Sequence, residues 1–285
     1  MTRSNYVSES VEVSRYLLPL LSEHQLYQVV SIFKKGFNLK PVKASSRSLI
    51  YVSLMDKDHF SVINYAFHQQ QLLKHLLANL QIGDRIVITA EKMVVYSLQR
   101  PLRIDVARMT SISTDFSDQI LNQADIDYLK KTLRSQDYID RSGFKKSELA
   151  YLLDEWRAIS FDLESMGRYR SLMARLIGRG SGLTPSGDDF LMGYLFALNV
   201  VGQDSRTFEL ILFQLLDSHS TTEVSLAYYE ALRLHHTSPI WHRLIQAIKN
   251  RSIDEVKRTV QAILKIGHTS GHDLLVGFLT FFETI

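Results

Sequence analysis

Two short motifs in the second half of the chain combine glycine, hydroxyl side chains and aspartate at the same spacing. The first spans residues 178–189 and reads GRGSGLTPSGDD, and the second spans residues 267–273 and reads GHTSGHD. With Asp189 placed over Asp273, 84 positions apart (273 − 189 = 84), both copies read Ser-Gly-x-Asp-x-Leu-x-Gly-x-Leu. Six fixed positions in ten indicate an internal repeat.

An apolar run at helical spacing follows each motif, so each motif is predicted to open a helix. A helix N-terminus offers free backbone N–H groups and the positive end of the helix dipole, which together bind anions. Thr184, Ser186, Thr269 and Ser270 add hydroxyl groups, and Arg179 adds positive charge. The motifs therefore predict a site for a small anion.

The same residues also have a purely structural interpretation, which stays open from the sequence. Ser186 with Asp189, and Ser270 with Asp273, fit the capping box, in which the serine and the acid each satisfy a free backbone N–H. Thr221 is expected to cap the helix that follows it.

Four side chains are candidates for acid–base chemistry: Asp188, Asp189, Asp273 and His268. An aspartate with a shifted pKa can orient a nitrogen or relay a proton, and a histidine can act as a general base. Adjacent carboxylates suit a hard cation, so Mg²⁺ is kept as a candidate cofactor at Asp188 and Asp189. The chain has no cysteine and no H-E-x-x-H motif, so no zinc site is expected.

Gly193 and Gly277 each lie four residues after an aspartate of the motif, on the same helix face. Because small residues let two helix backbones approach closely, we expect the two helices to cross near these glycines. Their N-termini would then meet at one small polar site.

Bulk composition limits the class of protein. A length of 285 residues suits one large or two ordinary domains, and a hydrophobic content of 45% is typical of a globular protein. A net charge of +3 is too small to indicate a nucleic-acid or membrane partner. No basic segment precedes an apolar core at the N-terminus, and no apolar run reaches the roughly 20 residues of a membrane span. We therefore expect a soluble cytoplasmic protein.

The elements that position the motifs change in character near residue 115. Before it, β-branched and aromatic runs predict strands over 26–33, 48–54, 60–64, 85–89, 93–98 and 102–106. One helix is predicted over 67–80, and another within 8–22, ending before Pro19. After it, apolar spacing predicts helices over 117–135, 145–176, 188–201, 205–218, 222–235, 240–250, 253–266 and 273–284.

The expected fold is α+β. A mostly-β sandwich or barrel domain spans residues 1–115, and an all-helical domain carrying both motifs spans residues 116–285.

The glycine motif resembles the G-[KR]-G-P-G-L-T-P-S-x-D-D signature of the AllH-like family, with Ser181 where that family has proline. Residues 267–277 resemble its G-H-T-S-G-x-D-x-L-x-G signature, and residues 221–225 (TTEVS) are similar to its T-T-x-V-S element. The resemblance covers residues 170–285. It marks as motif positions Gly180, Gly182, Thr184, Pro185, Ser186, Asp188, Asp189, Thr222, Ser225, His268, Thr269, Ser270, Gly271 and Asp273; Arg179 and Gly187 complete the candidate set.

This resemblance implies a function. A member of the family is a subunit of an oxamate carbamoyltransferase, which converts oxalurate and phosphate to oxamate and carbamoyl phosphate in anaerobic allantoin (purine nitrogen) catabolism. The implied partners are the other subunits of the enzyme and a small anionic substrate, with no nucleic acid and no membrane. Two alternatives stay open: a non-catalytic assembly or regulatory subunit, and a stand-alone Mg²⁺-dependent hydrolase.

Overall fold

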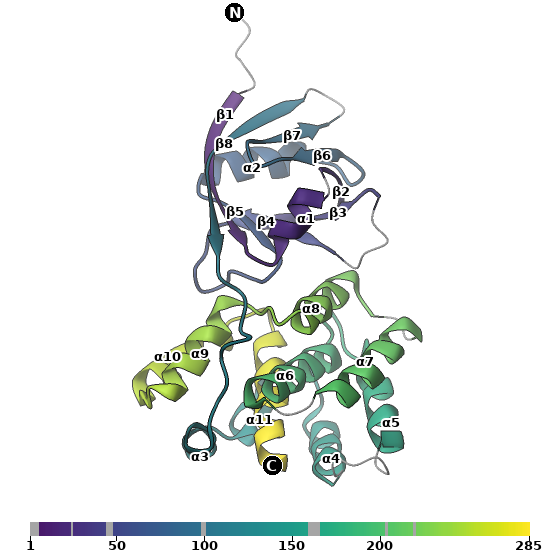
Figure 1. Cartoon of the computed structure of the whole chain (residues 1–285). Helices are drawn as coiled ribbons and strands as arrows, with labels where there is room; N and C mark the ends of the chain where they lie inside the picture. The colour runs from purple at the N-terminus through teal and green to yellow at the C-terminus, as the bar shows by residue number, and fades with distance from the viewer. Residues whose placement is uncertain are drawn as a thin grey trace, which may run out of the picture. The chain divides into compact units, whose positions relative to one another are not determined.

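The chain divides into two compact units, Met1–Asp115 with His236–Pro239, and Phe116–His235 with Ile240–Ile285 (Figure 1). This computed structural model describes residues 6–23, 25–43, 48–97, 101–158, 166–202, 205–218 and 221–285. The first unit is built on strands and the second on helices, so the predicted α+β fold class is confirmed. The short return of residues 236–239 to the first unit is held by the Thr237 N–H, which donates to the Thr114 carbonyl at 2.8 Å.

The described strands of the first unit form a closed barrel in the order β1-β5-β4-β3-β2-β6-β7-β8. Of the two predicted β architectures, the structure adopts the barrel. It closes because β1 pairs with β5 on one side and with β8 on the other. The strands are β1 (Tyr6–Ser14), β2 (Leu26–Phe33), β3 (Gly36–Pro41), β4 (Ile50–Leu54), β5 (Asn64–Phe67), β6 (Arg85–Ile88), β7 (Lys92–Tyr96) and β8 (Leu102–Ile112).

Side chains that alternate along the strands fill the barrel. On β2, Tyr27 and Val29 are buried, whereas the residue between them is exposed, as the two-residue period of a strand requires. Two helices, α1 (Leu17–Glu23) and α2 (Gln70–Asn79), complete the described part of this unit. Leu72, Leu73 and Leu76 of α2 pack into the same core.

Two predictions in this unit are wrong. Residues 8–14 form most of β1 rather than a helix, because Val11 and Val13 alternate with polar residues and both point into the barrel. The helix follows it and contains Pro19, which a first turn tolerates because its N–H needs no partner there. The strand expected over 60–64 instead begins at Asn64, whose side chain accepts hydrogen bonds from Ser61 and holds a turn before the strand.

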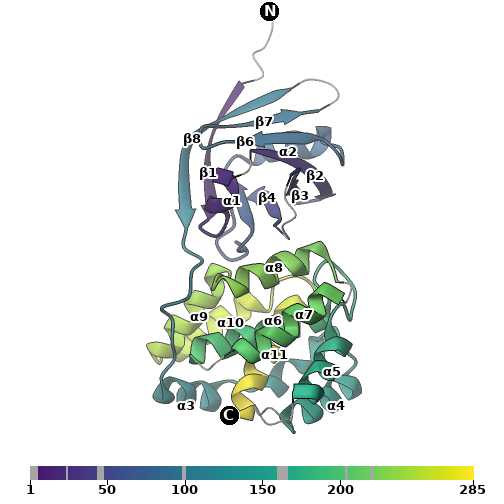
Figure 2. The same ribbon diagram turned by 45° about the vertical axis from the view of Figure 1, so that its right-hand side comes forward.

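The helices of the second unit surround a central pair, α6 and α11 (Figure 2). The described elements are α3 (Gln123–Thr132), the short 3₁₀ helix η1 (Ser135–Arg141), α4 (Lys146–Arg157), α5 (Met166–Leu176), α6 (Ser186–Val201), α7 (Arg206–Ser218), α8 (Glu223–Arg233), α9 (Pro239–Lys249), α10 (Ile253–Ile263) and α11 (Ser270–Thr284). Every residue of α6 from Ser186 to Val200 is buried. A helix that is buried on all sides must lie at the centre of its unit, so Asp188 and Asp189 of the first motif are buried there.

Aromatic side chains hold this central pair. Trp156 of α4 packs edge-on against Phe190 and Tyr194 of α6. On the other side, Trp241 of α9 packs against Phe278 of α11 at 5.4 Å between ring centroids. The core therefore fixes the two helices that carry the motifs.

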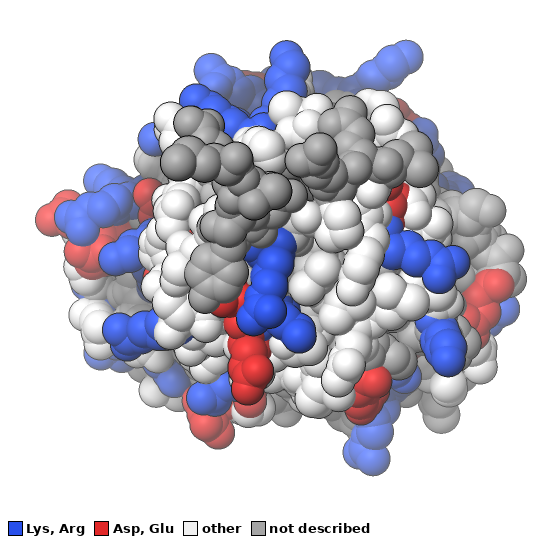
Figure 3. Space-filling view, turned by 90° about the horizontal axis from the view of Figure 1, so that it is seen from above, with Lys and Arg blue, Asp and Glu red and all other residues white. Residues whose placement is uncertain are grey.

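The face of the molecule seen in Figure 3 carries side chains of both charge signs, interspersed with uncharged residues. This mixture agrees with the small net charge of +3.

Candidate functional site

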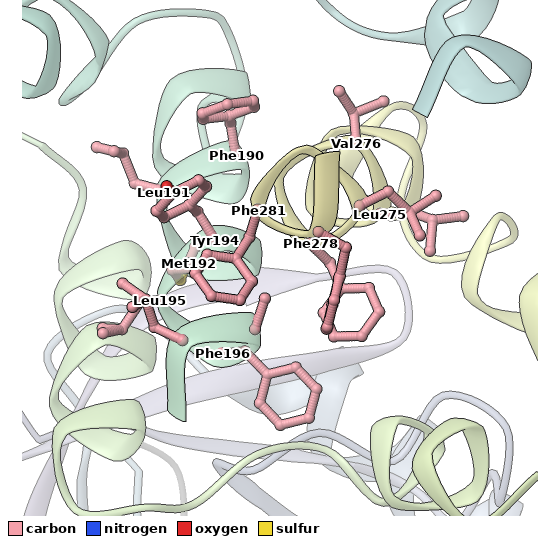
Figure 4. Packing of buried hydrophobic residues seen from close by; sticks show 14 of the residues in the cluster. Phe190, Leu191, Met192, Tyr194, Leu195, Phe196, Leu275, Val276, Phe278 and Phe281 are labelled. Carbon is pink, nitrogen blue, oxygen red and sulfur yellow. The ribbon is translucent and has the colours of Figure 1, made fainter. Parts of the chain in front are cut away.

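The two repeat helices cross at their glycines, as the sequence predicts. Hydrophobic side chains of both helices, among them Phe190 and Phe278, are shown in Figure 4. A Cβ added to Gly193 would lie 2.9 Å from the Phe278 amide nitrogen and closer still to the Leu274 carbonyl oxygen. A Cβ added to Gly277 would lie 2.9 Å from the Phe190 Cα and closer to the carbonyl oxygen of that residue. The backbones of α6 and α11 are thus in direct contact at this point.

The N-termini of the two helices also lie together. The Thr184 hydroxyl, just before α6, makes a 2.9 Å hydrogen bond with the hydroxyl of Ser270, the first residue of α11. Both hydroxyls are half-buried. The polar ends of the two helices therefore form one cluster, part of which is accessible to solvent.

The capping-box interpretation of the motifs is wrong. Ser186 and Ser270 are the first helical residues, whereas Pro185 and Thr269 occupy the N-cap positions and make no side-chain cap bond. The serines act across the crossing instead: the Ser270 hydroxyl favours ionised Asp189, and the Ser186 hydroxyl favours ionised Asp273. The hydroxyl of each serine thus stabilises the ionised aspartate of the opposite helix.

Asp189 is the acid of the cluster whose hydrogen bonds are incomplete among the described residues. Its side chain is only 2% exposed, and its Oδ2 has no hydrogen-bond partner among the described residues. Burial raises the pKa of Asp189 well above its usual range, and the charges of Asp273 and Asp188 push in the same direction. The Ser270 and Thr184 hydroxyls oppose this shift.

Asp273 is as deeply buried but fully engaged. The Ser142 hydroxyl donates to its Oδ1, and the Gly143 N–H lies 3.1 Å from Oδ1 and 3.3 Å from Oδ2. Burial raises the pKa of Asp273, while these donors and the hydroxyls of Ser186 and Thr269 lower it. The donors come from the loop between η1 and α4, so this loop is part of the site.

Asp188 points to a different set of partners. It accepts hydrogen bonds from the Thr221 hydroxyl at 2.5 Å, the Tyr229 hydroxyl at 3.1 Å and the Gly178 N–H at 3.2 Å. Burial raises its pKa, and these donors lower it. Neighbouring residues on a helix point about 100° apart, so the two adjacent aspartates serve separate clusters.

The start of α8 lies beside Asp188. Thr222, not Thr221, is the N-cap residue, and its hydroxyl accepts from the Ser225 N–H at 3.0 Å. The cap predicted at Thr221 is therefore wrong by one residue, because the hydroxyl of Thr221 is committed to Asp188. The buried Ser225 hydroxyl is near enough to Asp188 to lower its pKa but makes no hydrogen bond of good geometry there.

The glycine loop needs its glycines for two reasons. Gly180 and Gly182 have φ values of +118° and +101°, a region that side chains other than glycine rarely adopt. Gly187 packs directly on the Leu176 carbonyl at the end of α5, and Gly271 packs in the same way on the Ile263 carbonyl at the end of α10. Both motifs therefore fold a helix end tightly onto the start of the next helix.

Two predicted site residues lie apart from the buried cluster. Arg179 is half-exposed and forms an ion pair with Glu148 of α4. His268 is exposed. The buried histidine of the second motif is His272, whose Nδ1 lies 3.1 Å from the Tyr138 carbonyl. Any role of these side chains in binding stays a prediction.

Sequence reasoning missed four residues of the site: Ser142, Gly143, Thr221 and Tyr229. Tyr229 reads as an ordinary core residue, and Ser142-Gly143 as a helix breaker. A search for polar residues beside each buried acid could not have found them, because they lie far from the acids along the chain. Thr221, next to a recognised motif position, is the one that the sequence could have suggested.

Within the described residues, no group of three or more histidine, aspartate and glutamate side chains could hold a metal ion. A search of the same residues finds no helix with the length and apolar character needed to cross a bilayer.

The second unit is a helical domain in which the N-termini of two repeated helices meet around buried aspartates and hydroxyl groups. The comparison with known families is more specific. Residues 176–282 match the family model described as oxamate carbamoyltransferase subunit AllH, so this part of the chain is similar to that family, in agreement with the resemblance of its motifs. No solved structure matches the chain significantly.

Proposed function

We propose that this chain contributes the carbamoyl-binding part of the active site to an oxamate carbamoyltransferase, with other subunits as partners. The reaction would be the phosphorolysis of oxalurate to oxamate and carbamoyl phosphate. The setting that the resemblance implies, anaerobic allantoin breakdown in the cytoplasm, belongs to the same proposal. The family match over residues 176–282 supports the subunit assignment, and the geometry of the α6–α11 crossing supports the binding role.

One observation carries the proposal: a buried carboxyl oxygen, Asp189 Oδ2, has no hydrogen-bond partner among the described residues, and it lies where two helix N-termini meet. A buried polar atom without a partner costs about 1–3 kcal/mol of stability. Proteins satisfy nearly all such atoms, and an exception calls for an explanation such as a catalytic role or a bound water or ion. A ligand that reaches Asp189 would supply the missing bond.

The surrounding groups suit carbamoyl transfer. The reaction moves a small carbonyl group from an amide nitrogen to phosphate, and it needs hydrogen-bond donors for oxygen, a place for an anion and exclusion of water. The helix N-termini and the hydroxyls of Thr184 and Ser270 can donate to oxygen atoms. Because burial raises the pKa of Asp189, that side chain takes up a proton more readily than an exposed aspartate and can pass it to or from the amide nitrogen.

No observation favours the stand-alone Mg²⁺-dependent hydrolase. That alternative needs Asp188 and Asp189 to face one cation, whereas Asp188 is engaged by Thr221, Tyr229 and Gly178. The alternative of a non-catalytic assembly subunit is decided by the following experiment.

The test is the activity of the reconstituted complex. The full chain is combined with its partner subunits, and the formation of carbamoyl phosphate from oxalurate and phosphate is measured. Asp189→Asn and Asp273→Asn are each expected to lower the rate by about 10²- to 10⁴-fold, the usual contribution of a general acid or base. Asp254→Asn is the matched control, since Asp254 also lies in the first turn of a helix but is exposed. Full activity of both buried variants would leave only the assembly role.

A further inference from the structure

The α6–α11 crossing has an approximate two-fold symmetry that relates the two aspartates. Gly193 packs on Leu274, and Gly277 packs on Phe190, in the same way. Each of these residues maps to its counterpart by the offset of the sequence repeat: 277 − 193 = 84 and 274 − 190 = 84. The same offset relates Asp189 to Asp273. The surroundings of one aspartate can therefore be compared directly with those of the other.

At the Asp273 half of the site, the chain itself provides the partners. The Ser142 hydroxyl and the Gly143 N–H both donate to the carboxylate. Gly143 fits tightly there, because a Cβ on it would overlap the Ser186 hydroxyl and lie 3.1 Å from Thr269 Oγ1. This half of the site is a cradle for a backbone amide group, with the N–H directed at the acid.

At the Asp189 half, the corresponding donor is missing. The opposite-helix serine, Ser270, is present just as Ser186 is present for Asp273. No described amide group, however, donates to Asp189 Oδ2, although the side chain is only 2% exposed. The two acids therefore differ by the donors of the loop between η1 and α4, the Ser142 hydroxyl and the Gly143 N–H, and the second of these is an amide group.

We infer that the amide group of the bound carbamoyl substrate takes, at Asp189, the place that Gly143 takes at Asp273, with its N–H donating to Asp189 Oδ2. This inference rests on the proposed function and adds to it the orientation of the substrate. The NH₂ group faces the acid, and the carbonyl and phosphate oxygens face the N–H groups of the helix N-termini and the hydroxyls of Thr184 and Ser270.

The orientation determines specificity. Acetyl phosphate has the shape of carbamoyl phosphate but carries a methyl group in place of NH₂. A methyl group cannot donate to Asp189, so it leaves the buried oxygen unpaired. A site built to bind an N–H discriminates strongly against an analogue that lacks it. Inorganic phosphate, which has no acyl group, tests the anion-binding part alone.

The experiment measures dissociation constants of the full chain, alone and in the reconstituted complex, for carbamoyl phosphate, acetyl phosphate and inorganic phosphate by calorimetry. The wild type is expected to bind carbamoyl phosphate about 10- to 100-fold more tightly than acetyl phosphate, the range expected when one buried acceptor is left without its hydrogen bond. In Asp189→Asn this ratio is expected to fall by at least about tenfold, with phosphate affinity changed by less than about threefold. Asp254→Asn is expected to keep the wild-type ratio.

The outcomes separate the inference from the proposed function. Equal affinity of the wild type for the two acyl phosphates would overturn the inference and leave the carbamoyltransferase role in place. A ratio that survives Asp189→Asn would do the same. Failure of the chain and of the complex to bind any of the three compounds would overturn both. The comparison of the two acyl phosphates on the wild type needs no variant, so it holds even if Asp189→Asn does not fold.

Discussion

The helix crossing that builds the site can be tested by adding a single methyl group. In Gly193→Ala, the new Cβ would lie 2.9 Å from the Phe278 amide nitrogen and would overlap the Leu274 carbonyl oxygen. Ordinary contacts of a Cβ begin at 3.4 Å, so the helices must separate by at least 0.5 Å (3.4 − 2.9 = 0.5), and by more at the oxygen. The opposing atoms belong to a helix backbone and cannot rotate away.

The expected cost follows from packing energetics. Overfilling a well-packed core costs about 1–3 kcal/mol, and separation of α6 from α11 also loosens the aromatic contacts around Phe278. The higher helix propensity of alanine returns about 1 kcal/mol at most. We expect a net loss of about 2 kcal/mol. For a cooperative unit of 150–250 residues, a loss of 1 kcal/mol lowers Tm by about 2–4 °C, so the expected decrease is roughly 4–8 °C.

The assay is thermal unfolding of the full chain followed by the helical signal in circular dichroism. Gly167→Ala is the matched control, since Gly167 lies in helix α5 and a Cβ there would meet nothing within 4 Å. The control is expected to match the wild type or to gain stability slightly. If Gly193→Ala were as stable as Gly167→Ala, the crossing described here would be refuted.

Two further predictions concern the buried acids. The pKa of Asp189 is higher in the folded chain than in the unfolded chain. As pH rises above about 4, the Asp189 carboxyl therefore ionises in the unfolded chain before it ionises in the folded chain, and the wild type becomes less stable. A variant with no carboxyl at this position does not lose this stability. Urea unfolding should therefore show Asp189→Asn gaining stability relative to the wild type between about pH 4 and pH 7; a difference that stays constant with pH would contradict the raised pKa. Thr221→Val removes the hydroxyl that donates to Asp188 and keeps the shape, so it should cost about 1–3 kcal/mol in the same measurement. Thr132→Val, which removes a half-buried hydroxyl bonded only to the Tyr128 carbonyl of its own helix, should cost clearly less; equal losses would refute a special role for Thr221.

Most of the local structure could be predicted from the sequence. The apolar spacing of 3.6 residues predicted most of the described helices after residue 115, and glycines four residues after each aspartate predicted the crossing of α6 and α11. The single helix expected over 145–176 is wrong: α4 ends at Arg157 and α5 begins at Met166, and residues 159–165 lie outside the described residues. Where the sequence failed locally, as in β1, two patterns of similar strength overlapped over a few residues and the barrel decided between them. Pairing with β5 and β8 satisfied both edges of that strand, which no local pattern could reveal.

The sequence also named the three buried aspartates, because their spacing relative to the helix starts is a property of the chain alone. Only the tertiary structure decided what each acid meets. Ser186 and Ser270 serve the opposite helix rather than their own. Gly143 reaches Asp273 from 130 positions earlier in the chain (273 − 143 = 130). Helical spacing fixes the direction in which a side chain points, whereas its partner is set by long-range packing, and that packing left Asp189 as the acid without an amide.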